Sequence, residues 1–283
     1  MKRTLVFFAV LLIALGAFAQ NVPELNPNTH HFPVKGWARP GGGGGSNLIY
    51  HNGGAVIQAA HVVLIFWGPS FSGGGAQSTY AQQLQAFRGH FGTSPEYNVI
   101  TQYSQNGSQF IGLSNLSSAA SPDWFDTSTP PTNVTDAVVQ GEVSAYLALH
   151  AFDASAVYEV IIPPSSYSSD GTSTSCGGPN LAYCAYHGHF SSGANDVKYS
   201  IGPYPGCGGC QSAGFSDYQN AEHFVCHETR EAVTDPDLNA WFDRRGNEAD
   251  DKCAWSPTPF IGSGGFAYQY EWSNQVSGCV QSR

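Results

Sequence analysis

The chain has 283 residues and a formal net charge of −10; 41% of its residues are hydrophobic, 13% are aromatic and only 11% are charged. The acidic balance argues against nucleic acid or an anionic membrane surface as a partner, because both attract basic proteins. The apolar fraction is ample for a hydrophobic core. The length fits one large domain, which we place at residues 47–283.

Residues 1–19 have the parts of a secretory signal peptide: two basic residues near the start, an apolar run over 5–15, and Ala-Phe-Ala at the end as a cleavage signal. We therefore expect a secreted protein, extracellular or periplasmic. No later segment approaches the ~20 apolar residues that a membrane-spanning helix needs. Residues 20–46 lack apolar periodicity and end in glycines at 41–45, so we interpret them as a flexible leader.

The rest of the chain alternates between strand and helix patterns. Strands are expected at 61–68, 98–103, 157–162, 183–190 and 197–203, helices at 79–91, 136–152 and 216–235, and mostly loop over 111–131. This order predicts an α/β (α+β mixed) fold with a central mixed sheet. Alternation along 183–190 places His187 and His189 on one face. We assign them a structural or substrate-edge role, because no other candidate ligand is near them in the sequence.

The helix expected at 216–235 has clear boundary signals. Ser216 followed three residues later by Gln219 has the form of a capping box, in which the two side chains satisfy free backbone N–H groups. Asp235-Pro236 should end the helix, because a proline disfavours helical geometry in the residue before it.

One stripe of this helix carries candidate metal ligands. His223, His227 and Glu231 recur every four residues, which at 3.6 residues per turn places them on one face. Imidazole nitrogens and carboxylate oxygens are ordinary zinc ligands. The stripe therefore predicts a metal site, and a polar face open to solvent is the alternative.

Glu228 follows His227 directly, which gives His-Glu-x-x-Glu where common zinc peptidases have His-Glu-x-x-His. In that motif the first and last residues bind zinc, and the glutamate takes a proton from a water on the metal. We therefore predict His227 and Glu231 as zinc ligands and Glu228 as the catalytic base.

Further along, the segment 246–251 (GNEADD) resembles the Asn-Glu-x-x-x-Asp element of thermolysin-like (gluzincin) peptidases, with shorter spacing. The order of expected elements is also similar to that of a zincin, in which an edge strand lines the substrate cleft. The resemblance implies a zincin-like domain acting on a peptide or protein, with Glu248 as third zinc ligand and Asp251 orienting a ligand. His223 is the alternative third ligand.

Oxygen-bearing side chains also alternate just after the helix. Asp235, Asp237, Asn239 and Asp243 have the spacing of early positions in an EF-hand loop. The glycine and the final glutamate of an EF-hand are absent, so a looser calcium loop is the hypothesis. An acidic turn held by side-chain-to-backbone hydrogen bonds is the alternative.

All seven cysteines lie between 176 and 279, and an exported protein with such a cluster is expected to carry disulfides. We expect Cys176 with Cys184, and Cys253 with Cys279, the second pair tying the C-terminal region to the acidic segment. The pair in Cys207-Gly-Gly-Cys210 leaves three alternatives: a tight disulfide, a redox pair, or half of a structural zinc site.

Several short motifs resemble the EXORDIUM-like, phosphate-induced secreted proteins and their microbial relatives. They are Tyr50-His51-Asn52-Gly53, Ile65-Phe66-Trp67-Gly68, His227-Glu228, Val233-Thr234-Asp235-Pro236 and Cys253-Ala254-Trp255. The resemblance implies an extracellular protein associated with the cell wall or with growth responses, and it brings no established reaction.

Two functions follow from the sequence. The first is a secreted metal-dependent hydrolase, a zinc metallopeptidase that uses the His-Glu-x-x-Glu helix. The alternative is a non-enzymatic extracellular EXORDIUM-like protein in which calcium stabilises the acidic loop.

Overall fold

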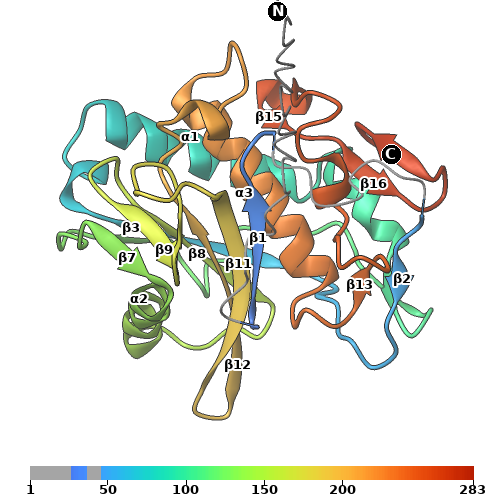
Figure 1. Cartoon of the computed structure of the whole chain (residues 1–283). Helices are drawn as coiled ribbons and strands as arrows, with labels where there is room; N and C mark the ends of the chain where they lie inside the picture. The colour runs from blue at the N-terminus through green and yellow to red at the C-terminus, as the bar shows by residue number, and fades with distance from the viewer. Residues whose placement is uncertain (1–26, 37–45) are drawn as a thin grey trace, which may run out of the picture.

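The computed structural model describes residues 27–36 and 46–283, so the predicted signal peptide lies outside the described residues. A six-stranded mixed sheet forms the centre (Figure 1). In spatial order its strands are β1 (Thr29–Pro33), β11 (Tyr183–Ser192), β12 (Asn195–Gly202), β8 (Ala156–Ile161), β3 (His61–Trp67) and β6 (Trp124–Asp126). The first three pair antiparallel, and the pairs from β12 to β6 are parallel. The predicted mixed α/β class with a central mixed sheet is confirmed.

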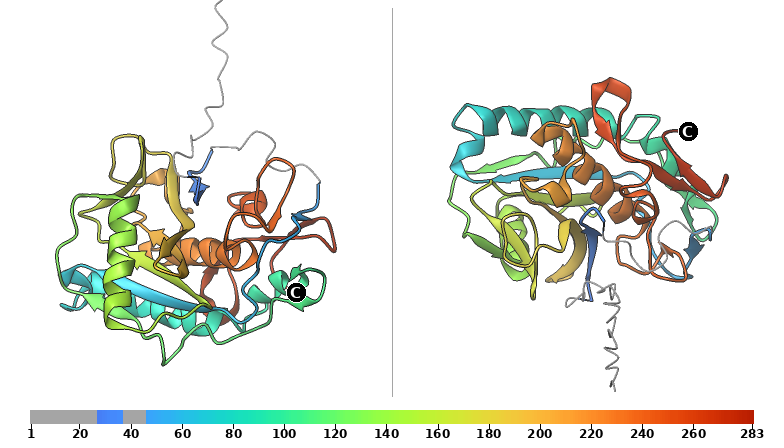
Figure 2. Two further views of the ribbon diagram at one scale, coloured as in Figure 1. Left: turned by 90° about the horizontal axis from the view of Figure 1, so that it is seen from below. Right: turned by 45° about the horizontal axis from the view of Figure 1, so that its top comes forward.

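Three α-helices in the described residues cover the sheet: α1 (Ala76–Phe91), α2 (Asp136–Leu149) and α3 (Asp217–Thr234). In β3, Val62 and Leu64 join the core beneath α1 and α3, whereas Val63 and Ile65 join the core beneath α2. Successive strand side chains point to opposite faces, so an unbroken apolar run suits a sheet that is covered on both faces. Figures 1 and 2 show α2 on the other face of the sheet from α3.

Helix α3 begins and ends where its local signals predict. Ser216 caps it: the Ser216 hydroxyl accepts from the Gln219 amide at 3.4 Å, and the Ser216 amide donates to Gln219 Oε1 at 2.9 Å. The helix ends at Thr234, one residue before Asp235-Pro236. Every residue from Asn220 onward is buried, so the alternative of a polar face open to solvent is wrong.

Strand β1 corrects the predicted flexible leader. Residues 20–26 and 37–45 lie outside the described residues, but Thr29–Pro33, within the same leader, forms a fully buried strand at one edge of the sheet. It runs antiparallel to β11, and His30 pairs with His187. The prediction failed because the sequence Thr-His-His-Phe-Pro gives a weak apolar signal, while the neighbouring strand supplies the pairing.

Shorter elements complete the described chain. The small sheets join β7 (Asn133–Thr135), β9 (Tyr167–Asp170) and β10 (Ser173–Thr174); β2 (Ile49–Tyr50) and β13 (Trp241–Phe242); β4 (Ser104–Gln105) and β5 (Gln109–Phe110); β14 (Phe260–Ile261) and β15 (Ala267–Tyr268); and β16 (Glu271–Ser273) and β17 (Gly278–Val280). The strand predicted at 98–103 is wrong: Tyr97–Gln102 is a 3-10 helix, and the amide of its first residue donates to the Ser94 hydroxyl at 3.1 Å. No helix among the described residues has the length and apolar character needed to cross a membrane.

Three disulfides join the described cysteines: Cys176–Cys207, Cys184–Cys210 and Cys253–Cys279. The predicted bond between Cys253 and Cys279 is confirmed, and the predicted bond between Cys176 and Cys184 is wrong. Instead Cys207 bonds Cys176 and Cys210 bonds Cys184, so all three alternatives for this pair are wrong: the tight disulfide between them, the redox pair and the zinc site. Such disulfides are expected in an oxidising compartment. Cys226, in α3, is a buried free thiol.

Candidate metal centre

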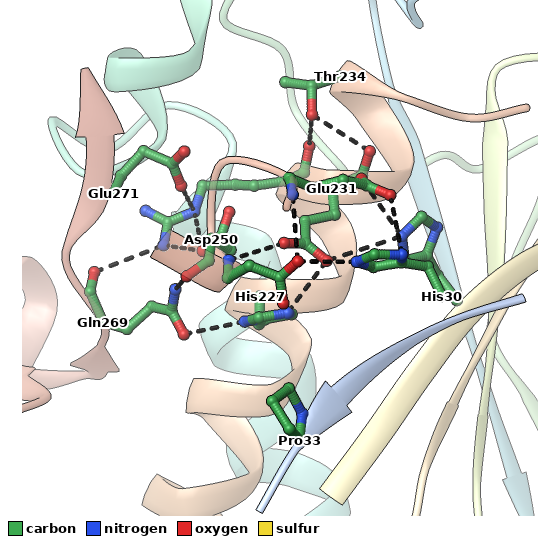
Figure 3. A network of polar contacts seen from close by, with 12 residues as sticks. His30, Pro33, His227, Glu231, Thr234, Asp250, Gln269 and Glu271 are labelled. Atoms are coloured by element: carbon green, nitrogen blue, oxygen red, sulfur yellow. Dashed lines mark hydrogen bonds and ion pairs between the residues drawn. The ribbon is translucent and has the colours of Figure 1, made fainter. Parts of the chain in front are cut away.

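Four segments bring ionisable side chains to one buried place beside α3. The helix supplies His227, Glu228 and Glu231, and β11 supplies His187. The segment 248–251 supplies Glu248 and Asp251, the second of which is the first residue of the 3-10 helix Asp251–Cys253. Strand β1 supplies His30. Figure 3 shows His227 and Glu231 on α3 facing the ring of His30.

Glu231 lies at the centre of this cluster. It belongs to three groups whose possible metal-binding atoms all lie within 4.8 Å of one another: one with His30 and Glu248, one with His187 and Glu228, and one with His227 and Asp251. Its atom Oε2 lies 3.0 Å from His227 Nε2 and 3.7 Å from His187 Nε2. A single cation placed beside Glu231 would therefore have imidazole and carboxylate donors on several sides.

The spacing of these donors suits zinc. A tetrahedral ion with bonds of about 2.0–2.2 Å keeps its ligand atoms roughly 3.3–3.6 Å apart. Besides the two distances from Glu231, His187 Nε2 lies 3.5 Å from Glu248 Oε2. Separations of 3.0, 3.5 and 3.7 Å fall close to the edge length of such a tetrahedron.

Several of the possible metal-binding atoms make no hydrogen bond. Among the described residues, His187 Nε2, His227 Nε2, Glu231 Oε2 and both carboxylate oxygens of Glu228 are buried without a hydrogen bond. All four side chains are fully buried. Each such orphaned polar atom costs about 1–3 kcal/mol, and native proteins contain few of them. Their convergence is the pattern expected where a ligand fills the gap.

Gln269 selects the tautomer of His227 that leaves Nε2 available. The Gln269 amide nitrogen donates to the carbonyls of Asp250 at 2.8 Å and Tyr270 at 3.3 Å, so its oxygen faces α3. That oxygen accepts hydrogen bonds from His227 Nδ1 at 3.0 Å and from His223 Nε2 at 2.9 Å. Since an amide oxygen only accepts, His227 keeps a proton on Nδ1, which leaves Nε2, facing Glu231, as the nitrogen that a metal ion can bind.

The metal-free charges in the cluster are mutually compensated. Burial lowers the pKa of His227, but the charge and hydrogen bond of Glu231, together with the charges of Asp250 and Asp251, outweigh burial and raise this pKa to about 9. Burial lowers the pKa of His187 well below its ordinary value, and the nearby imidazoles of His30 and His227 add to the effect. Burial, followed by the charge of Glu231, raises the pKa of Glu228 well above that of an ordinary glutamate. A cation in the same place would replace the proton that His227 holds.

His30 and Asp251 extend the cluster toward β1. His30 Nε2 lies 2.8 Å from Asp251 Oδ2, and His30 Nδ1 lies 3.5 Å from Glu248 Oε1. Because Glu248 Oε2 faces His187, Glu248 stands between the two histidines of the paired strands. The Asp251 amide also donates to Glu231 Oε1 at 2.9 Å, which holds one oxygen of Glu231 and leaves Oε2 for the cluster.

A buried ion-pair network fixes the other side of α3. The guanidinium of Arg230 contacts the carboxylates of Asp250 and Glu271, and all three side chains are completely buried (Figure 3). Arg230 Nε lies 2.7 Å from Glu271 Oε2. Asp250 precedes Asp251 in the chain, and the Asp250 carbonyl accepts a hydrogen bond from Gln269. The network therefore also positions the backbone that carries Asp251.

The structure brings most of the predicted zinc residues together and separates one of them. His227, Glu228, Glu231, Glu248 and Asp251 all lie in the cluster. His223 does not: it points one turn back, donates to Gln269, and packs edge-on against Trp255 with ring centroids 4.9 Å apart. Burial lowers the pKa of His223 to about 3, although its bond to Gln269 raises it.

The residues of the hypothesised calcium loop do not converge. Asp235 Oδ1 accepts from the amides of Asn239 at 2.6 Å and Ala240 at 2.5 Å, and Asp243 accepts from the amides of Arg245 and Asn247. Asp237 pairs with Lys198. Among the described residues, no candidate group of His, Cys, Asp and Glu side chains contains two of the three predicted calcium-binding aspartates. Their placement matches the alternative, an acidic turn held by hydrogen bonds.

His30, His187 and Gln269 are the contributors that sequence reasoning missed. His187 was assigned a structural role because its partners are far away in the sequence, and His30 was placed in the leader. The only sequence signal was the alternation of His187 and His189 in a strand expected near the helix. His189 itself lies away from the cluster and pairs with Asp196 at 3.0 Å.

No known protein family, curated protein or solved structure matches the chain.

Proposed function

We propose that the chain is a secreted zinc-dependent hydrolase that cleaves peptide bonds, with His187, His227, Glu231 and Glu248 as the zinc ligands. The proposal keeps the predicted helix ligands and the predicted Glu248. It adds His187 from the sheet and omits His223, which is engaged elsewhere.

One observation supports the proposal: Glu231 lies within ligand distance of buried His187, Glu228 and His227, whose Nε2 and carboxylate oxygen atoms make no hydrogen bond. A carboxylate-only cluster would suit calcium or magnesium, but two imidazole nitrogens with carboxylates favour a transition metal such as zinc. Each proposed imidazole is also completely buried, so solvent does not satisfy it in place of an ion.

The surrounding residues fit hydrolysis. A bound zinc ion lowers the pKa of a water molecule and polarises a carbonyl group. Glu228 adjoins the ligands His187 and Glu231 within the same group, where a carboxylate can take the proton that the attacking water loses and pass it to the leaving amine. Gln269 holds His227 in the tautomer that binds metal. Asp251 and His30 form a hydrogen-bonded pair beside the site.

Two further features support a zincin-like, secreted peptidase. Ligands one turn apart on a helix beside a sheet strand are the arrangement implied by the His-Glu-x-x-Glu resemblance. The signal-peptide pattern and the three disulfides suit export, and the resemblance to EXORDIUM-like proteins suggests association with the cell wall.

Metal content of the full chain tests the metal site. Plasma mass spectrometry should find about one zinc per chain, by the stoichiometry of a mononuclear site. His227→Ala and His187→Ala should each lose it. His223→Phe is the matched control, because it removes a buried imidazole of the same helix that lies outside the cluster, and it should retain zinc. Absence of zinc in the native chain, or loss of zinc only in His223→Phe, would refute the assignment.

Turnover tests the catalytic role separately. Glu228→Gln preserves the size of the side chain and should keep zinc bound, yet it should lower peptide hydrolysis by roughly 10²–10⁴-fold, the usual contribution of a general base. Hydrolysis that persists unchanged in Glu228→Gln would remove Glu228 from the mechanism. Zinc without any hydrolysis in the native chain would leave a metal-binding protein and refute the peptidase.

A further inference from the structure

Strand β1 covers the candidate metal centre. Its residues from Thr29 to Pro33 are all buried, and it lies alongside β11 next to α3 (Figure 1). Hydrogen bonds continue at both ends: the His189 amide donates to the Asn28 carbonyl at 3.1 Å, and the Val34 amide donates to the Ala182 carbonyl at 3.2 Å. The main chain of β11 beside the cluster is therefore occupied by another segment of the same chain.

One face of β1 contacts the cluster directly. His30 reaches Asp251 and Glu248, and Phe32 stacks on the ring of His227 with centroids 4.0 Å apart. Phe32 also stacks on Trp255, with centroids 5.1 Å apart, and is fully buried. A strand with one side chain stacked on aromatic rings and another beside the metal ligands is how an extended peptide would bind here.

We propose that β1 occupies the substrate position, and that the substrate is an extended polypeptide which pairs antiparallel with β11 when β1 leaves. The inference rests on the proposed function. In the state that the structure describes, the chain inhibits itself, because β1 holds the backbone edge, the aromatic contacts and the approach to the cluster.

The sequence around β1 suits a segment that can be detached. It follows the predicted signal peptide closely, and five glycines at 41–45 separate it from the next described segment. Cleavage within 37–45 would leave β1 bound only by noncovalent contacts, which an unfolded polypeptide could replace. A strand added to a sheet edge gains most of its affinity from main-chain hydrogen bonds, so substrates of varied sequence could do so.

Gly188 offers a way to weaken β1 without changing a cluster residue. It pairs with Thr29, and a Cβ atom at Gly188 would lie 2.3 Å from the carbonyl oxygen of Asn28. Only a residue without a side chain allows β1 to lie this close. A peptide that pairs only with residues 183–187 of β11 would not meet this Cβ atom. Gly141, in α2, is the matched control, because a Cβ atom there meets nothing within 4 Å.

The first experiment compares zinc-loaded native protein, Gly188→Ala and Gly141→Ala as full chains. Gly188→Ala should hydrolyse a dye-quenched unfolded casein roughly tenfold or more faster, because a larger fraction of molecules has the substrate position open. Hydrogen exchange of the β11 amides should accelerate in the same variant. Gly141→Ala should behave as native in both measurements.

The second experiment does not depend on turnover and covers the case in which Gly188→Ala misfolds. A specific protease site is placed at 41–45 of the full chain, with the same site in the exposed turn around Gly107 as control. After cleavage at 41–45, a fluorescent peptide of residues 27–36 should bind, and its Phe32→Ala version should bind on the order of a hundredfold more weakly. The control cut should allow neither peptide to bind.

The outcomes separate the two proposals. Zinc-loaded protein with native turnover, native β11 exchange and no peptide binding after either change would overturn the role of β1 and leave the metallopeptidase standing. Protein without zinc or turnover would refute the metallopeptidase. Binding of the 27–36 peptide and hydrogen exchange of the β11 amides would then decide, without any turnover, whether an extended peptide can replace β1.

Discussion

The most direct test of the metal geometry is Gln269→Met. The substitution keeps the volume of a buried side chain but removes the oxygen that accepts from His227 Nδ1 at 3.0 Å and from His223 Nε2 at 2.9 Å. Without that acceptor, His227 can move its proton to Nε2 and bond Glu231 Oε2, which lies 3.0 Å away. In that tautomer the lone pair needed by zinc is absent.

The expected loss can be bounded. Removing the hydrogen-bond acceptor behind a metal-binding histidine typically weakens metal affinity by about 10–100-fold, which corresponds to roughly 1.4–2.7 kcal/mol. Stability should also fall, because His223 loses its acceptor and each orphaned buried donor costs about 1–3 kcal/mol. The two effects are measured separately, by competition with a zinc chelator and by urea unfolding of the metal-free protein.

His223→Phe supplies the control for Gln269→Met. It removes the other donor to the same oxygen but leaves the bond that selects the His227 tautomer, so zinc affinity should stay near the native value while stability changes. Nitrogen NMR of the metal-free protein above pH 9, where His227 is neutral, should report its Nδ1 proton in the native chain and in His223→Phe, but not in Gln269→Met. Native zinc affinity in Gln269→Met, or equal losses in both variants, would refute the tautomer argument.

Three other predictions concern stability. Arg230→Met should destabilise the fold by about 3–5 kcal/mol in urea unfolding, because two buried carboxylates lose their cation; a loss below 1 kcal/mol would contradict this. Cys253→Ser combined with Cys279→Ser should cost about 3–4 kcal/mol by the loop-entropy estimate for a separation of 26 residues, with native zinc content retained. Burial raises the pKa of Glu159 to about 8, so the folded state binds this proton more tightly than the unfolded state does. Relative to Glu159→Gln, the native protein should therefore be most stable below about pH 4.5 and should lose up to about 4–5 kcal/mol as the pH rises through 8. Parallel pH profiles of unfolding free energy for the two proteins would refute this prediction.

Local rules account for what the sequence predicted well. The capping residues Ser216 and Gln219, the end of α3 before Asp235, and the common face of His227 and Glu231 all depend on helix geometry within a few residues. The apolar strands β3 and β8 were found for the same reason, since continuous apolar runs have few other uses in a chain of this length.

The parts that sequence reasoning missed depend on pairing between distant segments. His30 and His187 are opposite each other in adjacent strands although 157 positions separate them in the chain, and only the register of β1 on β11 brings them together. Nothing in a run of His, Phe and Pro announces a buried strand, because its burial is supplied by α3 and β11. The disulfides also depend on distant segments: Cys184 bonds Cys210 and not Cys176, which is closer in the sequence.

The acidic segment after α3 shows a different limit. Alternate oxygen-bearing residues suit both a calcium loop and a series of hydrogen-bonded turns, because both need carboxylates close to backbone amides. Asp235 and Asp243 use their oxygens on amides two to five residues ahead, and Asp237 is held by Lys198 from β12. Sequence spacing alone cannot distinguish these uses.

The two sides of α3 solve the same electrostatic problem in different ways. On one side, buried Asp250 and Glu271 surround a cation that the chain itself supplies, Arg230. On the other side, Glu228 and Glu231 are equally buried, and among the described residues no lysine or arginine pairs with either of them.

A buried carboxylate without a cation costs several kcal/mol unless it takes up a proton, against a net stability of about 5–15 kcal/mol for a whole domain. Protonation of His227 relieves part of this cost for Glu231, and the raised pKa of Glu228 relieves another part by keeping that carboxyl neutral. A divalent cation would offset the burial cost of both carboxylates at once. It would also bind the neutral imidazole of His187, whose Nε2 makes no hydrogen bond when His227 and Glu231 share only a proton. The missing positive charge on this side of α3 is therefore the strongest physical reason to expect a metal ion there.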